Sequence, residues 1–247
     1  MGKGDSDAEA GPGRTLTARI ADDLGRAIVT GRIGVSAPFP VEAELCRRYS
    51  ASRPVVREAV KMLTAKGILR ARQRAGTAVE PEARWNLLDP DLLRWLLERD
   101  YSIELLVDFT RMRMAIEPRA AGLAATGASE AQRGNILTAI ERMAAAEAGR
   151  DDPLEADIGF HTAVLLASNN RFMRQFRDLS ETALRFSIRR TNALKRVTTP
   201  NVAEHRAVAD AIVAREPAEA AARMAALLRG ALDLLLADAG LPGEPDF

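Results

Sequence analysis

The stretch "AELCRRYSASRPVVREAVKMLTAKGILRARQRAGTAV", residues 43–79, contains the segments that decide the fold of the front of the chain. After a short helical segment, the "SAS" turn leads to Ser52, a good helix N-cap, and Pro54 follows in the first turn, where proline is tolerated. The second helix ends at Gly67, and apolar and basic residues then alternate around Gly76, as in a two-stranded ribbon. The stretch therefore predicts two short helices followed by a β-ribbon.

Positive charge is concentrated in this front part of the chain. Residues 1–80 contain 14 Lys and Arg against 9 Asp and Glu, and residues 40–79 alone contain 9 against 3. The whole chain has a net charge of only +1, so the remainder is net acidic. A basic front on an acidic body indicates that the front binds a polyanion.

Two short helices and a basic ribbon in this order describe a winged helix-turn-helix. In that fold the N-terminal residues of the second helix reach the base edges in the major groove of DNA. Ser52, Arg53 and Arg57 are placed there, and the two arginines are one helical turn apart. Arginine is the side chain best suited to bidentate contact with guanine or phosphate. The alternative is that these arginines form a solvated helix face, but the attached ribbon favours DNA binding.

The ribbon is also basic. Arg70, Arg72 and Arg74 lie along it, and Gly76 marks the place where the two strands are joined. We expect these residues to form the wing and to contact phosphates or the minor groove.

The rest of the chain reads as helices only. The 247 residues are enough for one large domain or two ordinary ones, and 47% hydrophobic residues with only 4% aromatics favour helices in a chain rich in Ala, Leu and Arg. The predicted fold class is mainly α, with an N-terminal winged helix-turn-helix and a C-terminal all-α helical bundle. The predicted boundaries are a disordered tail over 1–14, the DNA-binding domain over 15–80, a linker and connecting helix over 81–100, and an all-helical domain over 101–240.

Several kinds of site and location are excluded or disfavoured. The single cysteine, Cys46, excludes an intrachain disulfide and a zinc ribbon. No apolar run approaches the roughly 20 residues that a bilayer requires, and the polar N-terminus has no signal-peptide pattern. We therefore expect a cytoplasmic protein without a membrane partner.

The segment "EADIGFHTAVLLASNN", residues 155–170, contains one of only two histidines in the chain. His161 follows Asp157 by four residues, so both side chains lie on one face of an otherwise apolar helix. Burial of a carboxylate and an imidazole is costly unless they pair or bind something. The two residues are therefore an ion pair, a catalytic pair, or two ligands of a metal.

A second charged residue faces the apolar side of a helix, in "LLVDFTRMRMAIEPRA". Arg113 lies four residues after Phe109 and three before Ile116, so its side chain is predicted to point inward. Glu117 lies one turn further on. Arg113 is therefore either paired structurally with Glu117 or available for an anion.

The front of the chain resembles the winged helix-turn-helix of GntR-family transcription regulators. The usual wording of that family, "P-x-E-x-x-L … SR-x-x-VREAL … G-x-G-T-x-V", is matched from Pro40 to Val79. The resemblance implies that Arg53 and Arg57 read an operator. One position departs, because many members have Arg directly before Glu44 and this chain has Ala43, so one expected DNA contact is missing.

The helical remainder resembles the effector-binding and dimerisation domain of the FadR subfamily, the type called FCD. The resemblance then extends over about residues 15–240. A narrower likeness, to the galactonate-operon repressor group, rests on "WNLLDPDLLRWLLERDY" (residues 85–101), "AELC" and "EADIGFH".

The resemblance also implies a metal site. In the FCD type an Asp and three His hold a divalent metal, and Asp157, His161 and His205 match the first three of these ligands. Leu227 stands where the last His is usual, so the fourth ligand is missing. We expect zinc, with nickel or manganese as alternatives, and water at the open position. The alternative is that Asp157 pairs with a histidine and no metal binds.

The resemblance places the effector carboxylate on Arg113, and a sugar acid would also suit Arg190 and Thr191. The predicted function is a dimeric repressor of sugar-acid catabolism genes, released from its double-stranded operator by an aldonate such as galactonate. One alternative is a metal-dependent enzyme of sugar-acid metabolism with a DNA-binding head, although we find no nucleophile motif or phosphate loop. Another is a non-specific DNA-packaging protein.

Overall fold

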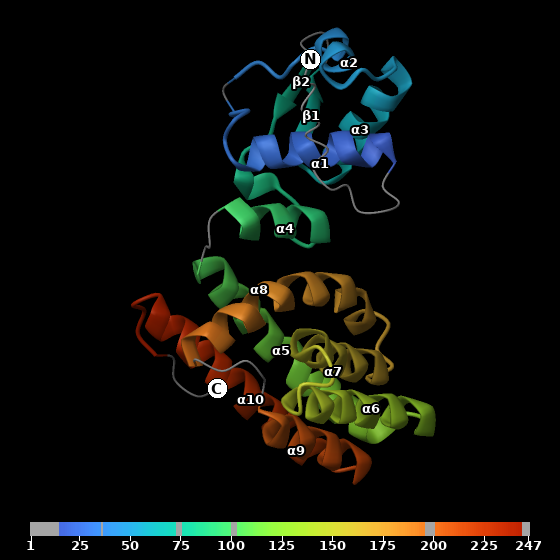
Figure 1. Cartoon of the computed structure of the whole chain (residues 1–247), viewed down its shortest axis with the longest axis vertical. Coiled ribbons are helices and arrows are strands. Elements are labelled where there is room, and N and C mark those ends of the chain that lie inside the picture. The colour runs from blue at the N-terminus through green and yellow to red at the C-terminus, as the bar shows by residue number, and fades with distance from the viewer. Residues whose placement is uncertain (1–14, 36, 73–75, 100–102, 196–200, 244–247) are drawn as a thin grey trace, which may run out of the picture. The chain divides into compact units, whose positions relative to one another are not determined.

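The chain divides into two compact units, Met1–Arg99 and Asp100–Phe247 (Figure 1). The computed structural model describes residues 15–35, 37–72, 76–99, 103–195 and 201–243. The predicted tail over 1–14 lies outside the described residues. The predicted fold class is confirmed, because the first unit is a winged helix-turn-helix and the second is built from helices.

The first unit has its elements in the order expected from the sequence. The strands pair antiparallel, with Leu69 opposite Val79 and Arg72 opposite Gly76. The elements are α1 (Leu16–Val29), α2 (Glu42–Tyr49), α3 (Arg53–Ala65), β1 (Leu69–Arg72), β2 (Gly76–Val79), η1 (Glu82–Arg84) and α4 (Pro90–Arg99).

The turn between α2 and α3 is tight. Ser50 ends α2 in the left-handed region with φ of 48°, and Ser52 then occupies the N-cap position of α3 with extended backbone. Pro54 lies in the first turn of α3, as expected. The Ser52 hydroxyl, however, forms no capping hydrogen bond, so Ser52 caps α3 by backbone conformation only.

Helix α4 is packed against α1 within the first unit. The Asp22 carboxylate of α1 accepts hydrogen bonds from Arg94 Nη2 at 2.7 Å and Trp95 Nε1 at 2.9 Å, and from Arg26 Nε at 2.9 Å. Burial raises the pKa of Asp22, but these donors outweigh it and hold the pKa below its usual range. The Trp95 ring lies so close to Gly25 that a Cβ there would meet a ring carbon at 2.3 Å. The helix predicted as a connecting segment is therefore packed into the winged unit.

The second unit contains the remaining helices. A capping box begins α6, since Ser129 Oγ accepts from Gln132 N and Gln132 Oε1 accepts from Ser129 N. No helix in the described part of the chain is both long and apolar enough to cross a membrane. The elements are α5 (Ile103–Gly127), α6 (Glu130–Glu147), α7 (Pro153–Ala167), η2 (Met173–Phe176), α8 (Arg177–Lys195), α9 (Val202–Val213) and α10 (Pro217–Asp238).

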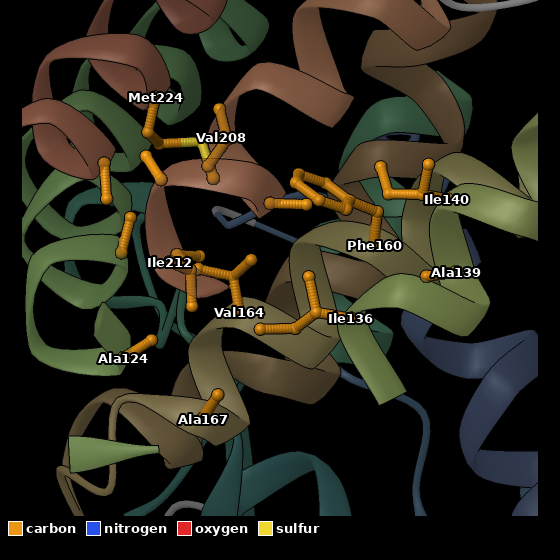
Figure 2. Packing of buried hydrophobic residues seen from close by; sticks show 14 of the residues in the cluster. Ala124, Ile136, Ala139, Ile140, Phe160, Val164, Ala167, Val208, Ile212 and Met224 are labelled. Atoms are coloured by element: carbon orange, nitrogen blue, oxygen red, sulfur yellow. The ribbon is translucent and has the colours of Figure 1, made fainter. Parts of the chain in front are cut away.

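The core of the second unit is built around α7. Phe160 and Val164 of α7 are fully buried, and side chains from four other helices surround them (Figure 2). The Phe160 ring also packs edge-on against the rings of His161 and His205, with centroids 5.5 and 5.0 Å away. The apolar core therefore forms one wall of a polar cluster. The surrounding residues include Ala124 of α5, Ile136 and Ile140 of α6, Val208 and Ile212 of α9, and Met224 of α10.

Gly25→Ala is expected to destabilise the first unit by about 1–3 kcal/mol, because the new methyl group overlaps the buried Trp95 ring. The chain has only two tryptophans, Trp85 and Trp95, so tryptophan fluorescence during urea unfolding reports on this unit. Gly34→Ala is the control, since a Cβ at Gly34 meets nothing within 4 Å. Equal unfolding midpoints for the two variants would contradict the close packing of α1 on α4.

Candidate DNA interface and metal centre

The N-terminal turn of α3 presents two arginines to solvent. The side chains of Arg53 and Arg57 are 72% and 65% exposed. They lie one helical turn apart on the helix that the fold supplies for the major groove. The predicted DNA-reading residues are thus on the surface.

A glutamate of α2 contacts both arginines. Glu42 Oε2 accepts a hydrogen bond from Arg57 Nε at 2.7 Å, and Glu42 Oε1 lies 3.8 Å from Arg53 Nε. The Glu42 side chain is only 31% exposed. One carboxylate therefore links the first residue of α2 to the first turn of α3.

The wing differs in part from the expectation. Arg70 of β1 forms an ion pair with the buried carboxylate of Glu80, which also lies 3.5 Å from Arg84. Arg70 therefore neutralises Glu80 after the second strand. Arg72 is the last residue of β1, opposite Gly76, and Arg74 lies outside the described residues.

The second unit brings together Asp157 and His161 of α7 and His205 of α9. All three side chains are buried, and one potential ligand atom from each lies within 4.8 Å of the others. The Nε2 atoms of His161 and His205 are each 3.3 Å from Asp157 Oδ1. Two ligand atoms about 2.0–2.1 Å from a tetrahedral zinc ion are about 3.3 Å apart, so these two separations suit a metal.

Both imidazole rings are held by their other nitrogen. His161 Nδ1 donates to Glu117 Oε2 at 2.7 Å, and His205 Nδ1 donates to the Asn201 carbonyl oxygen at 2.8 Å. Because both partners are acceptors, each Nδ1 carries the donated proton, and Nε2 of each ring faces Asp157. An Nδ1–H held by an oxygen is the usual outer-shell arrangement of a metal-binding histidine.

Asp157 Oδ1 supplies the test of whether these residues fit a metal. This buried oxygen has no hydrogen-bond partner among the described residues, although two imidazole nitrogens face it. A buried carboxylate oxygen without a partner is costly. A cation between the three side chains would satisfy it, so the donor set fits a divalent metal.

The electrostatics favour positive charge at this place. Burial raises the pKa of Glu117, but Arg113 and His161 outweigh it and lower the pKa to about 2. Burial likewise raises the pKa of Asp157, and His161 and His205 bring it below its usual range. Burial lowers the pKa of His161, whereas Glu117 raises it above its ordinary value. The two ionised carboxylates therefore favour either a protonated imidazole or a metal ion between them.

Arg113 of α5 points inward, as predicted, and is paired with Glu117. Arg113 Nε donates to Glu117 Oε1 at 2.6 Å, and Nη2 donates to Glu117 Oε2 at 3.3 Å. The same Nη2 lies 3.1 Å from Nδ1 of His161. Glu117 thus contacts both the inward arginine and a histidine of the cluster.

The three cluster residues line a cavity of about 50 Å³. Arg113, Thr191 and Leu227 also line it, so an apolar side chain stands beside the cluster at the position where the sequence resemblance implies a fourth ligand. Arg190 is placed elsewhere, because its guanidinium pairs with Asp238 of α10. The remaining lining residues are Ser187, Ile188, Asn192, Asn201, Glu204, Leu228 and Ala231.

Comparison with known proteins identifies both units. The family described as "Bacterial regulatory proteins, gntR family" matches residues 16–79, and the FCD domain matches residues 108–230. The chain is 35% identical to the galactonate operon transcriptional repressor of Escherichia coli (strain K12) over 197 residues, 79% of this chain and 86% of that protein. The chain belongs to the gntR family of bacterial regulatory proteins.

Other relatives of this GntR-family protein agree. It is 32% identical to the HTH-type transcriptional regulator YieP of Escherichia coli (strain K12) over 218 residues, 87% of this chain and 94% of the relative. A solved structure of Lar, which controls the expression of the Listeria monocytogenes agr system, has a TM-score of 0.55 at 16% identity. The match to Lar covers 92% of this chain and 99% of the other, and it shows a shared fold.

These relatives decide the class of protein. They are named transcriptional regulators, so this GntR-family chain is a DNA-binding regulator and not a metal-dependent enzyme. Its first unit binds operator DNA and its FCD domain binds a small effector.

Three contacts were not anticipated from the sequence. They are the link from Glu42 to the arginines, the hydrogen bond from His161 to Glu117, and the Asn201 carbonyl that holds His205. The four-residue spacing of Arg113 and Glu117 predicted their pairing, but it did not predict that His161 also contacts Glu117. A backbone carbonyl has no sequence signal.

Arg57→Ala is expected to lower operator affinity by at least about tenfold and to leave the fold intact, because the side chain is exposed on α3. Fluorescence anisotropy at fixed salt, with a duplex that the wild type enriches from a random library, measures this. Lys61→Ala, which removes an exposed cation further along α3, is the control and should have a smaller effect. Unchanged affinity of Arg57→Ala would remove this residue from the interface.

Leu227→His is expected to strengthen zinc binding by at least about tenfold, because it adds an imidazole beside the three donors. Competition with a coloured chelator gives the affinity. Leu234→His puts a histidine on the same helix outside this cavity and should leave the affinity unchanged. If both variants matched the wild type, the ion would not lie next to Leu227.

Proposed function

We propose that this regulator is a homodimeric repressor of sugar-acid catabolism genes that leaves its operator when an aldonate such as galactonate binds. The main support is that the buried Asp157, His161 and His205 share one cavity with Arg113 and with Thr191. The cavity thereby joins the candidate metal cluster to a guanidinium and a hydroxyl. The name of the galactonate operon repressor of Escherichia coli, to which the chain is 35% identical, points to the same class of effector.

On the DNA side, the proposal assigns operator contacts to Ser52, Arg53 and Arg57 of the helix region and to Arg72, Arg74 and Gly76 of the wing. The exposure of Arg53 and Arg57 supports this assignment. Regulators with this motif bind two half-sites related by a twofold axis, so a homodimer is the matching form.

On the effector side, Asp157, His161 and His205 would hold a divalent ion, zinc in our proposal. Such an ion would supply positive charge and coordination positions for oxygen ligands. Leu227 offers no donor atom, so water or effector oxygens would complete the shell. Glu117 and the Asn201 carbonyl would keep the two imidazole rings oriented.

The effector carboxylate would bind Arg113 by competing with Glu117. A guanidinium forms short, bidentate bonds with a carboxylate. The cavity of about 50 Å³ is much smaller than ordinary ligand pockets of about 300–1,000 Å³, so an aldonate must enlarge it. Helix α8 forms one wall of this cavity, through Ser187, Ile188, Thr191 and Asn192. Movement of that wall is the change we propose to be coupled to operator release, typically by about 1–3 kcal/mol.

Arg113→Lys is expected to weaken galactonate binding by at least about tenfold, because an ammonium group cannot reproduce the guanidinium fork. Operator affinity without effector should stay normal, so the variant would remain bound to DNA when galactonate is added. Calorimetry on zinc-loaded protein, together with anisotropy on DNA, measures both properties.

The matched control is Arg111→Lys, because Arg111 lies on the same helix and contacts Asp108 at the surface. The uncharged lactone should bind poorly to the wild type, since it lacks the carboxylate. Equal affinity of Arg113→Lys and wild type for galactonate would place the carboxylate elsewhere. Absence of any response of the wild type to aldonates would reject the effector class.

A further inference from the structure

The Glu42 carboxylate lies at the surface proposed to meet DNA phosphates. It is the first residue of α2, and it contacts the side chains of Arg53 and Arg57 on α3. Residues 40–79 contain only 3 acidic residues against 9 basic ones. A negative charge beside phosphates weakens binding to every DNA sequence.

The contacts to both arginines use the same nitrogen. Glu42 approaches Nε of Arg57 at 2.7 Å and Nε of Arg53 at 3.8 Å, and its hydrogen bond with Arg57 uses Nε and not a terminal nitrogen. No other ion-pair partner of Arg53 or Arg57 is present among the residues that the structure describes. The two side chains are 72% and 65% exposed, so core packing does not fix them. Glu42 is therefore the acidic side chain that both arginines share, with a hydrogen bond to Arg57 and a longer contact to Arg53.

From this geometry we propose that Glu42 is a positioning residue for operator specificity. It holds the arginines of α3 in the arrangement that matches guanine edges, and it reduces their attraction to phosphates of any sequence. Ordering a long side chain before binding lowers the entropy lost in a specific complex. Binding to non-specific DNA requires no such arrangement, so the carboxylate only opposes it.

The proposal rests on the proposed operator contacts of Arg53 and Arg57. Its distinctive consequence is a pair of opposite effects. Loss of the Glu42 charge should strengthen binding to unrelated DNA and at the same time weaken discrimination. A residue with a merely structural role would lower both affinities together.

The experiment uses the full-length protein and two duplexes, one enriched by the wild type from a random library and one with the same base composition in shuffled order. Glu42→Gln is expected to reduce the ratio of the two affinities by at least about tenfold while binding the shuffled duplex more tightly. Glu42→Asp retains the charge but is too short to reach Arg57 in the same way. It should lower the ratio without tighter binding to the shuffled duplex.

Glu44→Gln is the control, because it removes the same charge from the same helix. Glu44 forms no ion pair with any residue in the described ranges 15–35, 37–72, 76–99, 103–195 and 201–243. It should raise both affinities alike and leave the ratio unchanged. In an Arg57→Ala background, Glu42→Gln should lower the ratio much less than in the wild type, since contacting residues are not additive.

Several results would overturn the inference. They are an unchanged ratio in Glu42→Gln, an equal loss of ratio with and without Arg57, and weaker binding of Glu42→Gln to both duplexes. Circular dichroism of each variant shows whether it is folded, and Glu42→Asp provides the test if Glu42→Gln is not. Failure of the wild type to enrich any duplex would instead reject the proposed operator binding.

Discussion

The second unit depends on one electrostatic constraint, the burial of the Asp157 carboxylate among imidazole rings. Oδ1 of this residue lies 3.3 Å from two Nε2 atoms and has no hydrogen-bond partner among the described residues. Such an oxygen requires a positive partner. The contacts of His161 with Glu117 and of His205 with Asn201 hold the rings so that their Nε2 atoms face that oxygen. His161 of α7 and His205 of α9 bring nitrogen atoms to this oxygen, and Glu117 of α5 links His161 to the inward Arg113.

The first unit has a different electrostatic feature. It concentrates basic side chains, and several of them are paired with acidic side chains. Such pairs occur at the helix-turn-helix, at the wing and between α1 and α4. Glu42 contacts Arg53 and Arg57, the buried Glu80 pairs with Arg70, and Asp22 holds α4 on α1. In Arg53, Arg57 and Arg70 the nitrogen nearest to the carboxylate is Nε. The net charge of residues 40–79 does not reveal which of their arginines are paired with carboxylates.

The fold was largely predictable because its signals are local. Turn residues, a proline in the first turn and the Ser129–Gln132 capping box each act within a few residues of the chain. The metal cluster was only partly predictable, since Asp157 and His161 are close in sequence and His205 came from a family resemblance. The packing of α4 on α1 and the ion pair of Arg190 with Asp238 depend on contacts between distant segments. Contacts between distant segments produce no periodic pattern in the sequence from which they could be predicted.

The small volume of the cavity has a consequence for timing. A space of about 50 Å³ holds an ion and a few small atoms, so a larger effector can enter only while the helical wall is displaced. Wall movements of this kind occur on a microsecond to millisecond scale. If an aldonate binds here as proposed, its association rate would reach a plateau as its concentration rises, at the rate of the displacement. Helix packing would then set the speed of the response, and not the frequency of collisions between effector and protein.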